Sequence, residues 1–218
     1  MKKLSVIFMI LLIPTLLLGC QKVVTLEDSM SEITKIYFTA ETENVSGNIS
    51  VGQREEVYVV DGKHTSTCDF SLIALKFDEL LASNSIEVDL RINDSTDKLV
   101  LDLNPANHYY MADLGYLLKG EDNISICFQD NILNFENKSK NFGVDYNKAL
   151  SLAKAELGSK MDKYYEDKNF AGEGYLKILT GENDEEGQLF WVLTLVANDR
   201  TRNNVVLSVI DGRTIISE

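Results

Sequence analysis

The chain has 218 residues, of which 44% are hydrophobic and 25% are charged, and its formal net charge is -13 at pH 7. A chain this acidic is repelled by phosphate backbones and by anionic lipid, which argues against nucleic-acid binding. We interpret the charge as a means of keeping the protein soluble at a crowded surface. Only two histidines and three cysteines occur, which leaves few ligands for a zinc site.

The first 19 residues have the layout of a secretory signal. Lys2 and Lys3 precede an apolar run from Leu4 to Gly19, and small residues follow at a cleavage point. This run contains Pro14 and is 16 residues long. As a helix it is shorter than the ~20 residues that span a bilayer. The segment therefore predicts export followed by cleavage.

The end of this segment, Leu17-Leu18-Gly19-Cys20, resembles the lipobox of bacterial lipoproteins. The resemblance implies cleavage before Cys20, acylation of its sulfur, and attachment to membrane lipid on the outer face of the bacterial cell membrane. At least two acyl chains are expected, since one chain anchors a protein only marginally. We predict a signal peptide at 1–19 and a lipidated tether at 20–32, in an extracytoplasmic, lipid-anchored protein.

Residues 33–136 show the patterns of β-strands. The clearest alternation is Ile86, Val88, Leu90 and Ile92 against polar neighbours, which predicts one face in a core and one in water. The run Val57–Val60 ends in Asp61-Gly62, a hairpin-turn pair. About seven short strands with turn clusters between them favour a β-sandwich of immunoglobulin-like or jelly-roll type.

Two cysteines, Cys68 and Cys127, remain besides Cys20. An even pair in an exported protein permits one disulfide. Alternation places Cys127 on the face opposite Ile124, Ile126 and Phe128, which speaks for two separate thiols. The sequence leaves both alternatives open.

A polar stretch places a linker at 137–144, and a helix follows it. Asp145 is a good N-cap, and Gly158 stands where a C-terminal cap is expected. Between them an apolar stripe at helical spacing includes Ala149, Leu150 and Ala153. Strands are expected at 175–180, 189–197, 205–210 and 214–217. The fold class is thus α+β: an N-terminal sandwich, then a small helix-plus-antiparallel-meander domain at 145–218.

This second part resembles the PepSY family. The matching pieces are the alanine-rich helix Ala149–Leu157, the strand Phe190–Leu195, and Val205–Ile216 with its Asp211-Gly212-Arg213-Thr214 turn. PepSY domains occur in exported and membrane-attached bacterial proteins and in protease propeptides. The resemblance implies a domain that binds and regulates peptidases.

Catalytic motifs are absent from the sequence. His64 and His108 have no second histidine or cysteine at ligand spacing. The acidic run Glu182–Glu186 lacks the alternation and central glycine of an EF-hand and reads as a hairpin tip. Ser151-Leu152-Ala153-Lys154 matches one penicillin-binding element but its partner elements are missing. We expect no catalytic residues, no metal and no cofactor.

The strand at 189–197 is apolar on both faces, and one helix covers only one face of a small sheet. The other face is expected to meet the first domain, a second copy of the chain or a partner. For a partner site, the residues predicted are Trp191 and Phe190, because aromatic anchors dominate binding energy.

The function predicted is that of a non-catalytic envelope lipoprotein that binds or regulates another protein, such as a peptidase. The alternative is a ligand-binding lipoprotein that captures a small molecule or cation for a transporter. A concave pocket with a few polar groups favours the alternative. An envelope hydrolase is a third reading, and it requires a carboxylate pair or a His–carboxylate pair in a cleft.

Overall fold

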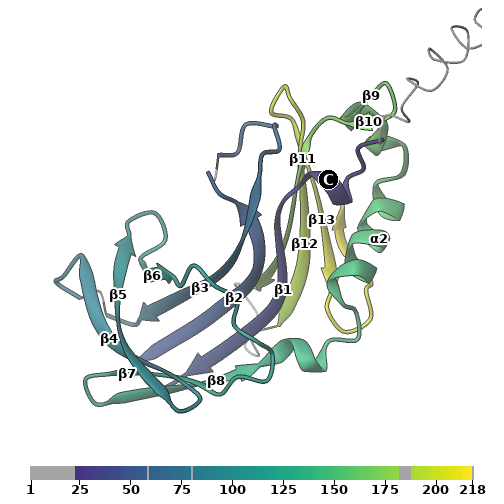
Figure 1. The fold of residues 1–218 in the computed structure, drawn as a ribbon. Helices are drawn as coiled ribbons and strands as arrows, with labels where there is room; N and C mark the ends of the chain where they lie inside the picture. Colours follow the sequence, from purple (N-terminus) through teal and green to yellow (C-terminus); the bar gives the residue numbers. More distant parts are fainter. Residues whose placement is uncertain (1–22, 58, 80, 182–187, 218) are drawn as a thin grey trace, which may run out of the picture.

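The computed structural model describes residues 23–57, 59–79, 81–181 and 188–217. Twelve strands form one continuous sheet in the order β14-β13-β12-β11-β1-β2-β3-β6-β5-β4-β7-β8, and β8 also pairs with β1. That last pairing closes eight strands into an antiparallel barrel, while β11 to β14 extend the sheet away from it (Figure 1). The fold is therefore a barrel and an open sheet that share one strand.

The barrel strands come from the first two thirds of the chain. Their bounds are β1 Met30–Glu41, β2 Val45–Glu55, β3 Thr67–Phe77, β4 Ser85–Ile92, β5 Ser95–Asn104, β6 Tyr109–Asp113, β7 Ile124–Phe128 and β8 Asn131–Asn137.

The barrel interior is a packed core. As the sequence predicts, Ile86, Val88 and Leu90 of β4 are buried while Glu87 and Arg91 are exposed. The other strands contribute large side chains with almost no exposure to solvent, among them Phe38, Ile49, Ile73, Leu75, Leu101, Ile126 and Leu133. Eight strands enclose a space just wide enough for side chains to fill. Because side chains fill this interior, we look for a ligand site on the outer surface of the barrel.

Strand β1 belongs to both parts of the sheet. Its first residues pair in parallel with β11 (Glu173–Thr180), with Met30 opposite Gly174 and Ile33 opposite Leu176. Two irregularities in register, one of them between Thr34 and Ile36, re-aim the strand on its way into the barrel wall. Gly52 permits the second, because a Cβ there would lie 1.8 Å from the Ile33 carbonyl oxygen.

The remaining strands complete the open sheet. Strands β12 (Leu189–Val196), β13 (Arg202–Ser208) and β14 (Thr214–Ser217) follow β11 as an antiparallel meander. Short elements fill the connections: the 3-10 helices η1 Glu27–Ser29, η2 Lys138–Asn141 and η3 Gly158–Tyr164, and a small hairpin of β9 Tyr165–Glu166 with β10 Asn169–Phe170.

The helix α2 (Tyr146–Leu157) covers one face of the open sheet, as Figure 1 shows. The carboxylate of Asp145 accepts the Lys148 backbone N–H at 2.8 Å, and Gly158 ends the helix with a φ of 49°. Its stripe of Ala149, Leu150 and Ala153 packs in one buried cluster with Leu193 and other sheet residues. The sequence-based helix is confirmed in both its ends and its buried face.

The predicted fold class is wrong: the first part is a closed barrel and not a sandwich. Both architectures use short alternating strands, and they differ in whether the last strand returns to the first. Here β8 pairs with β1 through Phe38–Asn137 and Thr39–Glu136. The open sheet then continues from β1, so helix and meander do not form a fold of their own.

Four further local expectations can be compared with the structure. Val57, Val59 and Val60 lie exposed in the connection between β2 and β3 and are not in a strand, because no neighbouring strand pairs with them in the described chain. Residues 23–32, assigned to a tether, include the fully buried Leu26 and the start of β1. Cys68 and Cys127 are half-buried free thiols, which is one of the two alternatives that the sequence leaves open. The predicted boundary at 137–144 falls on η2 and the approach to α2.

We expect Asp145→Ala to lower the free energy of unfolding by about 1 kcal/mol, because the N-terminal amides of α2 lose their side-chain acceptor. Asp145→Asn keeps an acceptor oxygen and should retain most of the stability. Urea denaturation of the three proteins measures the difference. Equal losses in both variants would show that charge and not capping is at work.

Candidate functional site

A groove of about 680 Å³ lies on the outside of the barrel, and it is the larger of two pockets described here. Its walls come from β1, β2, β3, β6 and β8 of the barrel and from the facing ends of β11 and β12. Ligand sites commonly have volumes of 300–1,000 Å³. Size and position make this groove the candidate functional site.

The groove follows the line where the barrel closes. Strands β1 and β8 pair at only two positions, and beyond them Glu41 of β1 and Asn134 of β8 both line the groove. Asn134 and Glu136 alternate with the buried Leu133 and Phe135, which point into the barrel. The groove thus lies over the seam of the barrel.

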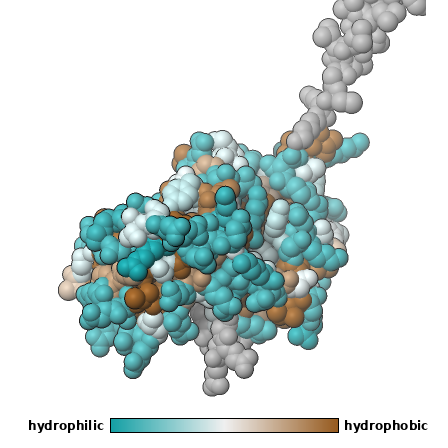
Figure 2. All heavy atoms as spheres, turned by 60° about the horizontal axis from the view of Figure 1, so that its bottom comes forward, coloured by the Kyte–Doolittle hydropathy of each residue, from teal (hydrophilic) through white to brown (hydrophobic). Residues whose placement is uncertain are grey.

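Its lining is polar and has charges of both signs. Lys138 pairs with Glu136, and the Lys76 Nζ lies 5.9 Å from the centre of the Tyr109 ring. Hydroxyl groups and side-chain amides, such as that of Asn48, also line the groove. The surface at this end of the molecule is largely hydrophilic, as Figure 2 shows. Such a lining suits a polar chain with its own donors and acceptors better than a lipid.

Tyr37 forms the best-fixed part of the lining. Only 4% of this residue is exposed. Burial raises the pKa of the Tyr37 hydroxyl, while a hydrogen bond with the Thr180 side chain opposes that rise. The Tyr37 backbone N–H donates to Ser139 Oγ at 2.7 Å, which ties η2 to β1 beside the groove. The groove therefore has a preformed floor at the junction of barrel and open sheet.

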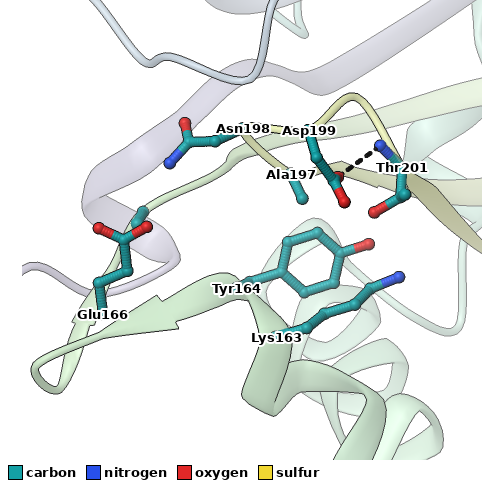
Figure 3. Close-up of a pocket in the computed structure, with 8 residues that line it drawn as sticks. Lys163, Tyr164, Glu166, Ala197, Asn198, Asp199 and Thr201 are labelled. Atoms are coloured by element: carbon teal, nitrogen blue, oxygen red, sulfur yellow. Dashed lines mark hydrogen bonds between the residues drawn. The ribbon is translucent and has the colours of Figure 1, made fainter.

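A smaller pocket of about 190 Å³ lies between η3 and the turn after β12 (Figure 3). Its floor is Tyr164, whose hydroxyl donates to Asn203 Oδ1 at 2.9 Å. Burial, with the nearby Asp199 carboxylate, raises the pKa of Tyr164 to about 12. Asp199 itself accepts the Thr201 N–H at 2.9 Å, the bond drawn in Figure 3. Its volume is below the range typical of ligand sites.

Two buried carboxylates hold the connection between β2 and β3, whose described residues 56, 57 and 59–66 we term the strap. Glu173 of β11 accepts the Gly62 N–H at 2.7 Å, and Glu55 at the end of β2 accepts the Thr65 N–H at 2.5 Å. The Nδ1 of His64 lies 3.4 Å from Glu55 Oε1. These groups face structural backbone amides and not a cavity, so we assign them to fixing the strap.

The environment of Glu173 disfavours its charge. Burial raises the pKa of its carboxyl above the ordinary value, and the nearby Glu55 and Asp61 carboxylates act in the same direction. The Gly62 N–H and the Tyr175 side chain oppose that rise. The strap is therefore held in part by a carboxyl group with an enhanced tendency to keep its proton.

The sequence-predicted partner residues are not in the groove. Trp191 is 1% exposed, and its indole N–H donates to the Val144 carbonyl at 2.8 Å, so it belongs to the core under α2. Phe190 is half-buried on the opposite face of β12, beside Leu179, which is 49% exposed. Both residues were predicted from their aromatic, apolar side chains, and this property does not distinguish a core residue from a binding surface.

Other candidates from the sequence are dispersed. His64 lies in the strap and His108 in the turn before β6. Ser151 donates to the Asn147 carbonyl within α2. Cys20 and Glu182–Glu186 lie outside the described residues. Within the described ranges, no group of three His, Cys, Asp or Glu side chains is placed to bind a metal ion. The groove itself was missed, because its residues come from seven separate strands.

Comparisons with protein-family models, with curated proteins and with solved structures found no match for this chain. Among the described residues, no helix has both the length and the apolar character needed to cross a bilayer. The groove's chemistry therefore has to be read from this structure.

We expect Glu173→Gln to flatten the dependence of stability on pH. Because the folded-state pKa of Glu173 is raised, its stabilising contribution is complete below the unfolded pKa of about 4.3 and is lost as pH rises through the folded value. Glutamine keeps an acceptor for Gly62 and does not titrate. Unfolding free energies from pH 4 upward should fall in the wild type relative to this variant.

Glu121→Gln removes an exposed carboxylate and is the matched control for this titration. Its profile should run parallel to that of the wild type. Parallel profiles for Glu173→Gln as well would contradict the assignment of a raised pKa to Glu173.

Proposed function

We propose that this protein is a non-catalytic lipoprotein on the outer face of a bacterial cell membrane, and that its outer groove binds an extended peptide segment of another envelope protein. The observation on which this proposal rests is the groove along the short seam between β1 and β8. The lipobox resemblance at Cys20 supplies the location.

The seam leaves a strand edge beside the groove. Residues 131–135 of β8 pair with β7 along one edge, while pairing with β1 begins only at Glu136. An extended peptide can add to such an edge through main-chain hydrogen bonds, and side-chain pockets then supply specificity. Strand addition therefore fits the position of the groove beside this edge.

The side chains of the groove fit the same ligand. Asn48 and Asn134 offer amide donors and acceptors to peptide groups, and Lys76 and Glu41 offer charges of both signs to side chains. A mixed lining of this kind selects a sequence through complementary charges. A peptidase is the partner class that the PepSY resemblance implies.

The groove is also the place where the alternative function would operate. A small polar molecule destined for a transporter would use the same amides and hydroxyls, since the volume lies in the range for small ligands. The two functions differ in what occupies the groove in the cell, and this can be measured.

Photo-crosslinking in intact cells tests the peptide proposal. A photoreactive amino acid at Asn48, inside the groove, should give one discrete adduct with an envelope protein. The same amino acid at Val100, which is 54% exposed on β5, is the control and should give none. Digestion of the adduct should identify a contiguous segment of the partner. Equal adducts from both positions, or none from either, would contradict the proposal.

A charge reversal sharpens this test. We expect Lys76→Glu to reduce the Asn48 adduct severalfold, because the groove loses a cation that faces the bound segment. Lys98→Glu makes the same change on β5, where Lys98 pairs with Glu87 and Asp89, and should leave the adduct unchanged. A loss of protein adduct together with a retained small molecule, found by mass spectrometry of the purified protein, would favour the alternative.

We expect Cys20→Ser to abolish acylation. Cells fed an alkyne-tagged fatty acid should label the wild-type protein and not this variant, because serine lacks the sulfur that accepts the lipid. Persistent labelling of Cys20→Ser, or an unlabelled wild type, would contradict the lipid anchor without bearing on the groove.

A further inference from the structure

We propose that the end of the molecule formed by Val23 and the strap rests on the membrane, with Val57, Val59 and Val60 entering its headgroup region. This inference depends on the proposed lipid anchor at Cys20. It adds an orientation and a second, non-covalent contact with lipid, and it uses none of the groove residues.

The distance between anchor and fold is short. Val23 follows Cys20 by three residue steps, and a fully extended chain of that length spans at most about 11 Å. The fold cannot stand off the membrane further than this at the point where the described chain begins. Some surface of the fold must therefore lie against the lipid headgroups.

Hydrogen bonds fix the first described residues to the rest of the fold. The Val24 N–H donates to Asn169 Oδ1 at 2.9 Å, and the Val24 carbonyl accepts the Phe170 N–H at 2.9 Å. Leu26 follows and is fully buried. Because Val24 is hydrogen-bonded to β10, a lipid anchor at Cys20 holds the β9–β10 hairpin near the membrane together with the start of the described chain.

The strap lies at this same end of the molecule, together with the β9–β10 hairpin and the β12–β13 turn (Figure 1). Contacts connect these segments. The smaller pocket brings Tyr164 and Ala171 against Ala197. Ala197 in turn touches the strap, since a Cβ on Gly62 would lie 2.4 Å from its carbonyl oxygen. A membrane in contact with Val23 is thus in reach of the strap.

The strap presents apolar side chains to the outside. Val57, Val59 and Val60 are 68%, 50% and 38% exposed, and Val23 is 51% exposed. The bonds of Gly62 to Glu173 and of Thr65 to Glu55 fix the strap from within. The valines therefore precede a part of the strap that is fixed to the body of the fold.

The lipid surface is the occupant that this geometry favours. A second contact that reinforces one membrane attachment needs only a few apolar side chains at headgroup depth. Acidic residues, among them Glu56 and Asp61, flank the valines, so attraction to anionic lipid is not expected. The contact should be hydrophobic and should occur on neutral lipid.

The test uses the full acylated protein in vesicles of neutral phosphatidylcholine. An environment-sensitive fluorophore is attached to a cysteine at Lys63, an exposed strap residue, after Cys68 and Cys127 have been replaced by serine. A matched protein has the probe at Ile132, which is 54% exposed on β8 at the far end of the barrel. Lipid-borne spin labels at headgroup depth should quench the strap probe and not the β8 probe.

A triple variant, Val57→Ser with Val59→Ser and Val60→Ser, should reduce quenching of the Lys63 probe severalfold while flotation with the vesicles is retained. Quenching that is absent from both probes in floating protein would overturn the orientation and leave the anchor intact. Protein that does not float and has no acyl mass on Cys20 would overturn the anchor, and with it this inference. An unchanged signal in the triple serine variant would show that the valines do not make the contact.

Discussion

The pairing of β1 with two different neighbours determines the rest of the architecture. Near Met30 the strand lies beside β11 in parallel, and near Phe38 it lies beside β8 in the antiparallel sense. A strand that follows a barrel wall cannot at the same time follow an open sheet, so β11 and β1 must diverge. The irregularity between Thr34 and Ile36, opposite Gly52, accommodates that divergence. The groove lies on the barrel wall beyond this point, and Thr180 at the end of β11 forms part of its lining.

Two buried carboxylates complete this junction from the other end. Glu55 and Glu173 satisfy backbone N–H groups of the strap in a region that excludes water. Hydrogen bonds from amides to carboxylates are stronger than those between neutral groups, which compensates in part for removing two carboxylates from solvent. The raised pKa of Glu173 shows that its charged form is still disfavoured in this buried position. The same end of the fold thus contains its most constrained loop and its most exposed valines.

Local patterns in the sequence predicted the local structure well. The alternation of β4 and the capped stripe of α2 follow from the periods of strand and helix, and both are found at the predicted residues. Closure of the barrel could not be predicted in this way, because it depends on a pairing between Phe38 and Asn137 that no local period encodes. The valine run at 57–60 has the composition of a strand but lacks a neighbour to pair with. Trp191 and Phe190 show the same limit, since burial depends on what packs over a strand and not on the strand itself.

The position of the groove relative to the proposed anchor at Cys20 has a mechanical consequence. β1 has 12 residues, which as an extended strand measure about 40 Å from the end near the proposed anchor to the end in the groove. When a partner held in the groove is pulled away from the membrane, tension enters β1 at one end and leaves at the other. Its hydrogen bonds to β2 and β11 are then loaded in parallel, as in shear, and not one after another, as in peeling. The strand that joins the barrel to the open sheet would thereby also carry the pulling force.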